Sequence, residues 1–177
     1  MTSPLSDSFS MTDDLARMRA DFDRLFAEEP RPREAAGEDL LAIRLGGDPY
    51  ALRLAEISYL SPSRPLAILP HAPPAFLGLT GLRGELLPAW DLAALLGYPT
   101  QAASIRWMVV CAGALRWSAA FEGLDGYLRA QKADLSPFAG EGPAAGFADE
   151  VCHQNGLLRP VLSLKRFLAI IQKGSHS

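Results

Sequence analysis

The spacing of apolar residues changes near Leu40 and divides the chain into two parts. From that residue onward apolar side chains recur at every second position, which is typical of strands with one buried face. Leu41, Ile43 and Leu45 form one such run, the turn sequence GGDP follows, and residues 50–54 form a second run. This pattern predicts a β-hairpin.

Further strand patterns follow along the chain. The continuous apolar run WMVVC (107–111) predicts a buried strand, and the alternation over 115–121 predicts its partner. Residues 61–78 contain five prolines and predict a loop or edge segments, and 137–146 predict a second loop. LLRPVLSL (157–164) predicts a strand that leads into a terminal helix. Because strands come in hairpins and do not alternate with helices, small antiparallel barrels are favoured over a doubly wound fold.

Before Leu40 the spacing is helical. Residues 12–28 predict an amphipathic helix that begins at Thr12, and the segment EEPRPREAAGED after it predicts a linker. The apolar residues of one face of this helix are Leu15, Met18, Phe22, Leu25 and Phe26. Docking on its own domain and docking on a partner both remain open. We expect a leader over 1–37, one domain over 38–171 and a disordered tail over 172–177.

Charge is distributed unevenly between these parts. The chain has 177 residues and a net charge of −3. Residues 1–39 carry ten acidic and five basic residues, so residues 40–177 carry a net charge of +2. This balance argues against nucleic acid as a partner, because binding its backbone depends on clustered lysine and arginine. No apolar run reaches the ~18–20 residues that span a bilayer, so no membrane insertion is expected.

The residues that most often carry catalysis or metals are poorly placed. Cys111 and Cys152 are isolated, which predicts structural thiols in a reduced, cytoplasmic protein. Cys152 and His153 are neighbours, so their side chains diverge on an extended chain and make a poor nucleophile–base pair. Phosphate-binding loops, nucleophile elbows and metal-ligand spacings are missing from the sequence. We therefore predict a protein without enzymatic activity, cofactor or metal.

The segment GLRGELLPAWDL (81–92) is the most specific feature of the sequence. Arg83 stands next to Gly84 and two residues after Gly81, so the backbone there is expected to turn sharply. Pro88 should limit the following strand to an edge or a bulge, because it has no N–H to donate to a ladder. Asp91 is placed to cap a short helix over 92–96.

This segment and its surroundings resemble the CheW-type coupling domain of bacterial chemosensory systems. That family shows Gly-x-x-Asn-Leu-Arg-Gly, two or three apolar residues, Pro and Asp-Leu. The matching residues are Gly78, Leu82, Arg83, Gly84, Pro88, Asp91 and Leu92. A weaker likeness extends over residues 38–169, including the first hairpin and the closing strand and helix.

The resemblance implies a mainly β fold of two SH3-like, five-stranded antiparallel β-barrel subdomains with a few peripheral helices. It also implies a non-enzymatic adaptor that couples the cytoplasmic tips of chemoreceptors to the regulatory domain of a CheA-type histidine kinase. Arg83, Gly81 and Gly84 would then form the receptor-binding site. Alternatively, Arg83 would tie one barrel to the other through buried carbonyls or a carboxylate.

Several positions depart from the family pattern. Gly81 stands where the family has Asn, and Tyr59 stands where it often has an acid tied to kinase contact. Glu122 replaces an Asp, and Ser163 occupies another Asp position. We expect Ile57, Tyr59 and Leu60 to form the kinase-binding face.

A second class of function also remains open. A small-molecule sensor or regulatory module would use the groove between the barrels, and a deep pocket with convergent polar groups would favour it. An enzyme is a more distant third reading. For the adaptor, the expected location is the cytoplasm, with recruitment to receptor arrays in a chemotaxis, pilus or other non-flagellar pathway.

Overall fold

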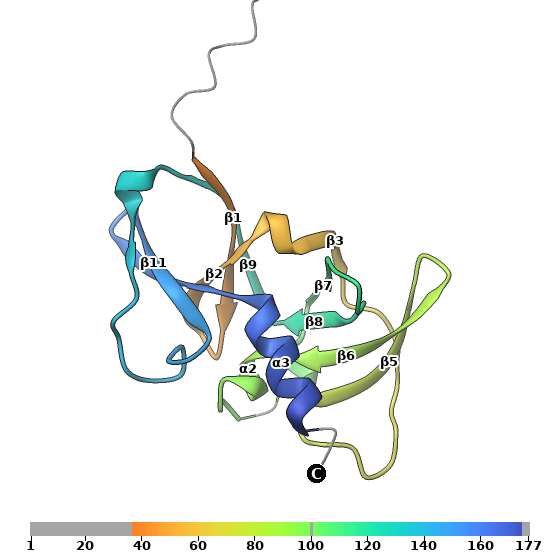
Figure 1. The fold of residues 1–177 in the computed structure, drawn as a ribbon. Helices are drawn as coiled ribbons and strands as arrows, with labels where there is room; N and C mark the ends of the chain where they lie inside the picture. The colour runs from red at the N-terminus through yellow and green to blue at the C-terminus, as the bar shows by residue number, and fades with distance from the viewer. Residues whose placement is uncertain (1–36, 100, 175–177) are drawn as a thin grey trace, which may run out of the picture. The chain divides into compact units, whose positions relative to one another are not determined.

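The computed structural model describes residues 37–99 and 101–174, and within them the chain is mainly β (Figure 1). Its strands are β1 (Glu38–Leu45), β2 (Asp48–Arg53), β3 (Ile57–Pro62), β4 (Leu66–Ala67), β5 (Phe76–Leu82), β6 (Glu85–Asp91), β7 (Trp107–Cys111), β8 (Ser118–Phe121), β9 (Gly123–Ala130), β10 (Leu135–Pro137), β11 (Ala148–Gln154) and β12 (Leu157–Leu162). Its helices are α2 (Leu92–Leu95) and α3 (Leu164–Gly174), with 3₁₀ turns η1 (Leu54–Glu56), η2 (Ala102–Ser104) and η3 (Lys132–Asp134).

These strands form two sheets. The first sheet has the order β10-β11-β12-β2-β1-β9, and the second has the order β3-β7-β8-β6-β5-β4. The chain leaves the first sheet after β2, builds the whole second sheet and then returns at β9. In Figure 1 the labelled strands β2 and β11 lie to the left, and β5 and β6 of the second sheet lie to the right.

The prediction of a mainly β fold with two subdomains is confirmed, with two differences in detail. Each sheet has six described strands instead of five, because the short β10 or β4 adds to one edge. Each sheet also contains a parallel pair, β2 with β12 and β6 with β8. These parallel pairs follow from the topology, since strands distant in sequence close each sheet.

The predicted local features match the structure closely. Gly46 and Gly47 form the two-residue turn of the β1–β2 hairpin with φ of 60° and 85°. The Asp91 carboxylate accepts a hydrogen bond from the Ala93 amide at 2.9 Å and so caps α2. Pro88 lies in β6 one residue before its ladder with β8 begins, so that part of the strand pairs only with β5.

Other expectations differ from the structure or fall outside it. Strand β8 is buried at all four positions and does not alternate, because Ala119 and Phe121 on one face enter the cluster between the sheets and Ala120 on the other face enters a second cluster. Helix α3 includes residues 172–174, which the sequence analysis placed in the tail. The predicted leader helix over 12–28 lies outside the described residues, as does its linker up to residue 36. The last two linker residues, Glu38 and Asp39, instead begin strand β1. No helix within 37–99 and 101–174 is long and apolar enough to span a bilayer.

The largest buried cluster lies between the two sheets and is built by both of them. The first sheet supplies side chains from β1, β2 and β12, the second sheet supplies β7 and β8, and both helices contribute. Its larger fully buried members include Ile43, Leu52, Leu92, Val109, Phe121, Leu162 and Phe167. The other buried clusters are smaller and each draws mainly on one sheet. Most of the apolar burial therefore holds the two sheets to each other.

Polar contacts reinforce this junction at two places. Tyr98, after α2, donates a hydrogen bond to Asp48 at 2.6 Å and lies 2.8 Å from the Tyr50 hydroxyl. The Glu56 carboxylate accepts a hydrogen bond from the Leu164 amide at 2.6 Å, at the positive end of α3. A residue between β2 and β3 thereby fixes the start of the last helix.

A buried arginine lies within the first sheet. Arg159 on β12 is 6% exposed and pairs with Asp125 on β9 at 2.7 Å. Arg44 on β1 pairs with the other oxygen of Asp125 at 3.0 Å. Burial opposes ionisation of Asp125, but the hydrogen bonds from both arginines outweigh it, so its pKa lies below the ordinary value.

Gly46→Ala should destabilise the junction more than Gly47→Ala does. Both glycines have positive φ, so both substitutions strain the turn. A Cβ at position 46 would also overlap the Tyr98 ring, whereas position 47 faces open space. We expect Gly46→Ala to cost about 1–3 kcal/mol more in the free energy of unfolding, measured by urea denaturation. Equal losses for the two variants would contradict the proposed role of Tyr98.

Asp125→Asn should destabilise the protein in a pH-dependent manner. At pH 7 it should cost about 1–3 kcal/mol, because the buried Arg159 loses its counter-charge. A lowered carboxyl pKa contributes stability that is complete above the unfolded value, about 4, and is lost as pH falls through the folded value. The gap between wild type and variant should therefore narrow below about pH 4, as thermal melting at several pH values would show. A gap independent of pH would contradict this assignment.

Candidate functional site

The arginine of the GLRG motif, Arg83, lies at the tip of the β5–β6 hairpin. Leu82 pairs with Glu85, so Arg83 and Gly84 are the two central residues of the turn. Their φ values are 51° and 81°, and two successive positive φ values are typical of a type I′ turn. Gly84 suits this conformation, whereas an arginine adopts it rarely. The turn places the Arg83 side chain at the exposed end of the hairpin.

The Arg83 guanidinium stacks on the ring of Tyr59. Its central carbon lies 4.5 Å from the ring centroid, within the range of a cation–π interaction. Tyr59 is half-buried on β3 and packs against the small cluster of Leu82, Leu87 and Val110. The structure thus brings together one residue predicted for receptor binding and one predicted for kinase binding.

The neighbouring acid does not pair with Arg83. Glu85, which follows in the sequence, forms its ion pair with Arg116 at 3.1 Å. Within residues 37–99 and 101–174, Arg83 has no ion pair or side-chain hydrogen bond. Its stacking partner also belongs to the second sheet, so these contacts give no support to the alternative in which Arg83 ties the two barrels together.

The remaining predicted residues have different environments. Ile57 and Leu60 are half-buried and pack against the large cluster between the sheets, away from the cluster that contains Tyr59. The predicted kinase-binding trio is therefore divided between two faces of β3. Gly84 is required by its positive φ, whereas Gly81 has no such φ and faces open space. Position 81 places no conformational demand on the residue.

Two exposed leucines are sequence neighbours of the Glu85–Arg116 ion pair. Leu86 on β6 is 68% exposed and Leu115, beside Arg116, is 54% exposed. We call Arg83, Tyr59, Glu85, Leu86, Leu115 and Arg116 the hairpin-tip surface. It combines an aromatic ring, two arginines and exposed leucines, which is a composition suited to protein contact.

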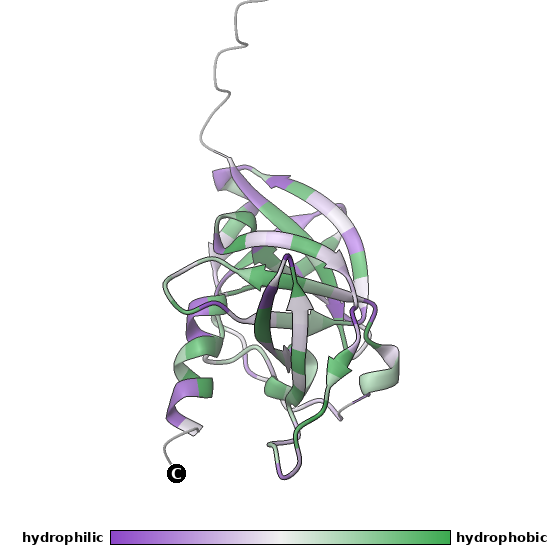
Figure 2. Cartoon of the chain, turned by 90° about the vertical axis from the view of Figure 1, so that its right-hand side faces the viewer, coloured by the Kyte–Doolittle hydropathy of each residue, from purple (hydrophilic) through white to green (hydrophobic). Residues whose placement is uncertain are grey.

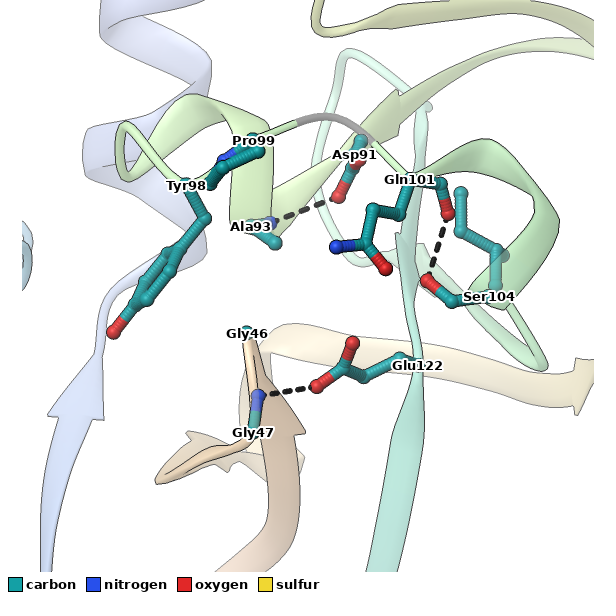
Figure 3. A pocket seen from close by; sticks show the side chains of 10 residues that line it. Gly46, Gly47, Asp91, Ala93, Tyr98, Pro99, Gln101, Ser104 and Glu122 are labelled. Carbon is teal, nitrogen blue, oxygen red and sulfur yellow. Dashed lines mark hydrogen bonds between the residues drawn. The ribbon is translucent and has the colours of Figure 1, made fainter.

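A separate polar pocket lies between the β1–β2 turn and the α2 region (Figure 3). Its volume is about 380 Å³, and Asp91, Glu122, Gln101 and Ser104 are among its polar lining residues. Asp91 caps α2, and burial raises its pKa. Glu122 accepts a hydrogen bond from the Gly47 amide at 2.5 Å, and the Ser104 hydroxyl donates to the Gln101 carbonyl. Three of these four side chains, those of Asp91, Glu122 and Ser104, thus bond to the protein's own backbone.

The sequence analysis did not identify the residues that contact Arg83 or that fix the start of helix α3. The cation–π pair joins positions 24 residues apart, and Glu56 caps a helix 108 residues away. Spacing along the chain carries no signal for such pairs. The departure at Tyr59 was visible, but its consequence for Arg83 depends on the pairing of β3 beside β7.

Comparison with known proteins shows consistent likenesses. The family model described as "CheW-like domain" matches residues 39–172. "Chemotaxis protein CheW" of Rhizobium meliloti (strain 1021) is 30% identical over 76 residues, which are 43% of this chain and 49% of the relative. "Probable chemotaxis protein CheW" of Rhizobium etli is 31% identical over 74 residues, 42% of this chain and 48% of the relative. The chain thus spans about half the length of the curated relatives it matches.

A solved structure is similar in fold. The crystal structure of the scaffolding protein TtCheW from Thermoanaerobacter tengcongensis superimposes with a TM-score of 0.65 at 13% identity. The match covers 73% of this chain and 90% of that protein. At this identity the likeness concerns the fold, and it agrees with the expected pair of SH3-like β subdomains.

Arg83 and Tyr59 should be energetically coupled. In a double-mutant cycle of Arg83→Ala and Tyr59→Leu, the losses in unfolding free energy should fall short of additivity by about 0.5–1 kcal/mol, the strength of an exposed cation–π pair. Leucine retains apolar packing against Val110, so the cycle isolates the stack. The matched control pairs Tyr59→Leu with Arg106→Ala, an exposed arginine before β7, and should be additive. Additivity in both cycles would contradict the stack in solution.

Proposed function

The chain belongs to the CheW-like domain family, and on this premise we propose that it is a non-catalytic signalling adaptor that couples chemoreceptors to a CheA-type histidine kinase. The adaptor would act through two protein-binding surfaces on one small β scaffold. Its location would be the cytoplasm, with recruitment to receptor arrays, and its pathway would be chemotaxis or a pilus-type or other non-flagellar response.

The stack of Arg83 on Tyr59 carries this proposal. The guanidinium carbon lies over the ring at 4.5 Å, and within the described residues the N–H donors make no ion pair or side-chain hydrogen bond. A planar guanidinium with free donors is well suited to bidentate pairing with a carboxylate or with carbonyl groups of a partner. The ring therefore orients the arginine in advance, and less rotamer entropy is lost when the partner binds.

With Tyr59 in place of the acid that the family often has, Arg83 of this chain has an aromatic neighbour instead of a carboxylate. An acid at this position would form an ion pair with the arginine and occupy its donors. Tyrosine orients the side chain through its face and leaves those donors available. We infer that Arg83, Gly81 and Gly84 bind the receptor tip, and that Tyr59, with the half-buried Ile57 and Leu60, contributes to the kinase contact.

The adaptor is better supported than the alternative of a small-molecule sensor. The pocket between the sheets has carboxylates, but they are engaged in capping α2 and in holding the β1–β2 turn. A ligand would have to compete with these contacts. For an enzyme, the described residues do bring one hydroxyl and one imidazole together, Ser136 Oγ and His153 Nε2 at 2.9 Å on β10 and β11. This pair lines neither of the two pockets, and both described thiols are buried.

Arg83→Ala should preserve the fold and weaken both receptor and kinase binding. Loss of a charge-assisted hydrogen bond at an interface should cost about 1.5–3 kcal/mol, roughly ten- to a hundredfold in affinity. Arg83→Lys should restore only part of the affinity, because an ammonium group lacks the planar fork. Affinities would be measured by calorimetry with a receptor cytoplasmic tip and a CheA-type regulatory domain, and the fold by thermal melting.

Arg106→Ala is the matched control, since it removes the same charge from an exposed position at the other end of the second sheet. It should leave both affinities unchanged. If Arg83→Ala binds both partners as tightly as wild type, Arg83 is not part of the site. A large fall in melting temperature with a proportional loss of binding would instead indicate a structural role.

A further inference from the structure

A second surface, distant from Arg83, has no role in the proposed coupling. An apolar groove of about 690 Å³ lies between the proline-rich segment before β5 and helix α3. Its lining residues include Leu69, Pro73, Phe76, Trp90, Leu95 and Ile170. Phe76 and Trp90 meet edge to face at 5.0 Å, whereas Leu69 and Ile170 are each 44% exposed.

The groove lies at the far end of the β5–β6 hairpin from the hairpin-tip surface. Phe76 pairs with Trp90 at the open end, and Arg83 forms the turn at the closed end. Seven residues of strand separate the two ends, about 20 Å at the usual rise. A single partner contact at Arg83 would not cover the groove.

The walls of the groove offer side chains but few backbone groups. Pro70, Pro73 and Pro74 have no N–H to donate. The carbonyls of Pro73 and Ala75 already accept hydrogen bonds from the amides of Phe76 and Asp91. On this wall an extended peptide would therefore find few free backbone groups with which to pair. A helix, which satisfies its own backbone groups, is the ligand suited to such a surface.

The proline-rich segment and helix α3, which form the two walls of the groove, carry basic residues and no acidic ones. Between Glu56 and Glu85 the chain has no acidic residue, and helix α3 has none. The exposed Lys173 is next to Gly174 at one end of the groove, and Arg64 belongs to the proline-rich segment. In Figure 2 hydrophobic and hydrophilic segments alternate along α3, as in an amphipathic helix. Acidic groups on a ligand would be attracted to this rim.

We propose that the groove between the proline-rich segment and α3 binds an amphipathic helix of a partner protein, with aliphatic residues on one face and acidic residues beside them. Aliphatic residues spaced at i, i+3, i+4 and i+7 would enter the groove between Leu69 and Ile170. Prolines hold one wall in place before binding, so little backbone entropy is lost there.

The test uses the full-length chain and a synthetic amphipathic peptide of about 18 residues with leucine on one face and glutamate on the other. Two control peptides are used. The first has the same composition in scrambled order, and the second has lysine in place of every glutamate. Binding would be followed by amide chemical shifts of the ¹⁵N-labelled protein. The acidic peptide should shift amides of residues 69–76 and 164–174 and bind more tightly than either control.

Substitutions in the groove would show where the peptide binds. Leu69→Asp and Ile170→Asp should each weaken binding of the acidic peptide about tenfold or more. Each variant places a carboxylate in an apolar contact and close to the glutamates of the peptide. Leu158→Asp is the matched control, since Leu158 is 57% exposed on β12 and lies outside the groove. Lys173→Glu should weaken the acidic peptide and strengthen the lysine peptide. Arg83→Ala should leave peptide binding unchanged, so this test is independent of the proposed coupling.

Other results would overturn the proposal. Equal binding of the acidic and scrambled peptides would show that the groove does not select a helix. Binding to vesicles of anionic lipid that Ile170→Asp abolishes, without peptide binding, would identify a membrane surface instead. Shifts of the groove amides on dilution, or on removal of residues 1–36, would identify a second copy or the chain's own leader as the occupant.

Discussion

The structure depends on one apolar cluster that the two sheets share. Neither sheet encloses much apolar volume alone, and the first even contains the buried arginine Arg159. The larger cluster between them joins strands from both sheets to both helices. Because close-packed interiors resist deformation, the two subdomains have a fixed relative orientation. The polar contacts of Tyr98 and Glu56 also hold the two sheets together.

Because the two subdomains have a fixed relative orientation, the exposed groups on each of them also have fixed positions. The hairpin tip projects from the second sheet, and its arginine is held by an aromatic ring. The apolar groove begins at the other end of the same hairpin. Partners bound at the two ends would therefore be held at a set separation by a strand pair that cannot easily bend. Under the proposed function, coupling between partners would then depend on this fixed geometry.

Much of this arrangement could be predicted from the sequence, because local physics determines it. The alternation of apolar residues and the turn residues predicted the β1–β2 hairpin. The position of Asp91 predicted the cap of α2, and the motif around Arg83 indicated the family. The partners of Glu56, Tyr98 and Arg83 could not be predicted, since each pair joins residues from separate strands or helices. The division of Ile57 and Tyr59 between two faces depends on a register shift in β3, which no pattern of apolar residues reveals.

The insertion of the second sheet within the first has a consequence for how the protein is made. Strand β2 ends about 70 residues before β9 begins, so the first hairpin leaves the ribosome long before its sheet partners exist. An isolated two-stranded hairpin is marginally stable in water. At typical rates of about 5–20 residues per second, its apolar face waits several seconds for β9 and β12. The second sheet, whose strands are contiguous in the chain, can form during that interval and supply the surface on which the first is completed.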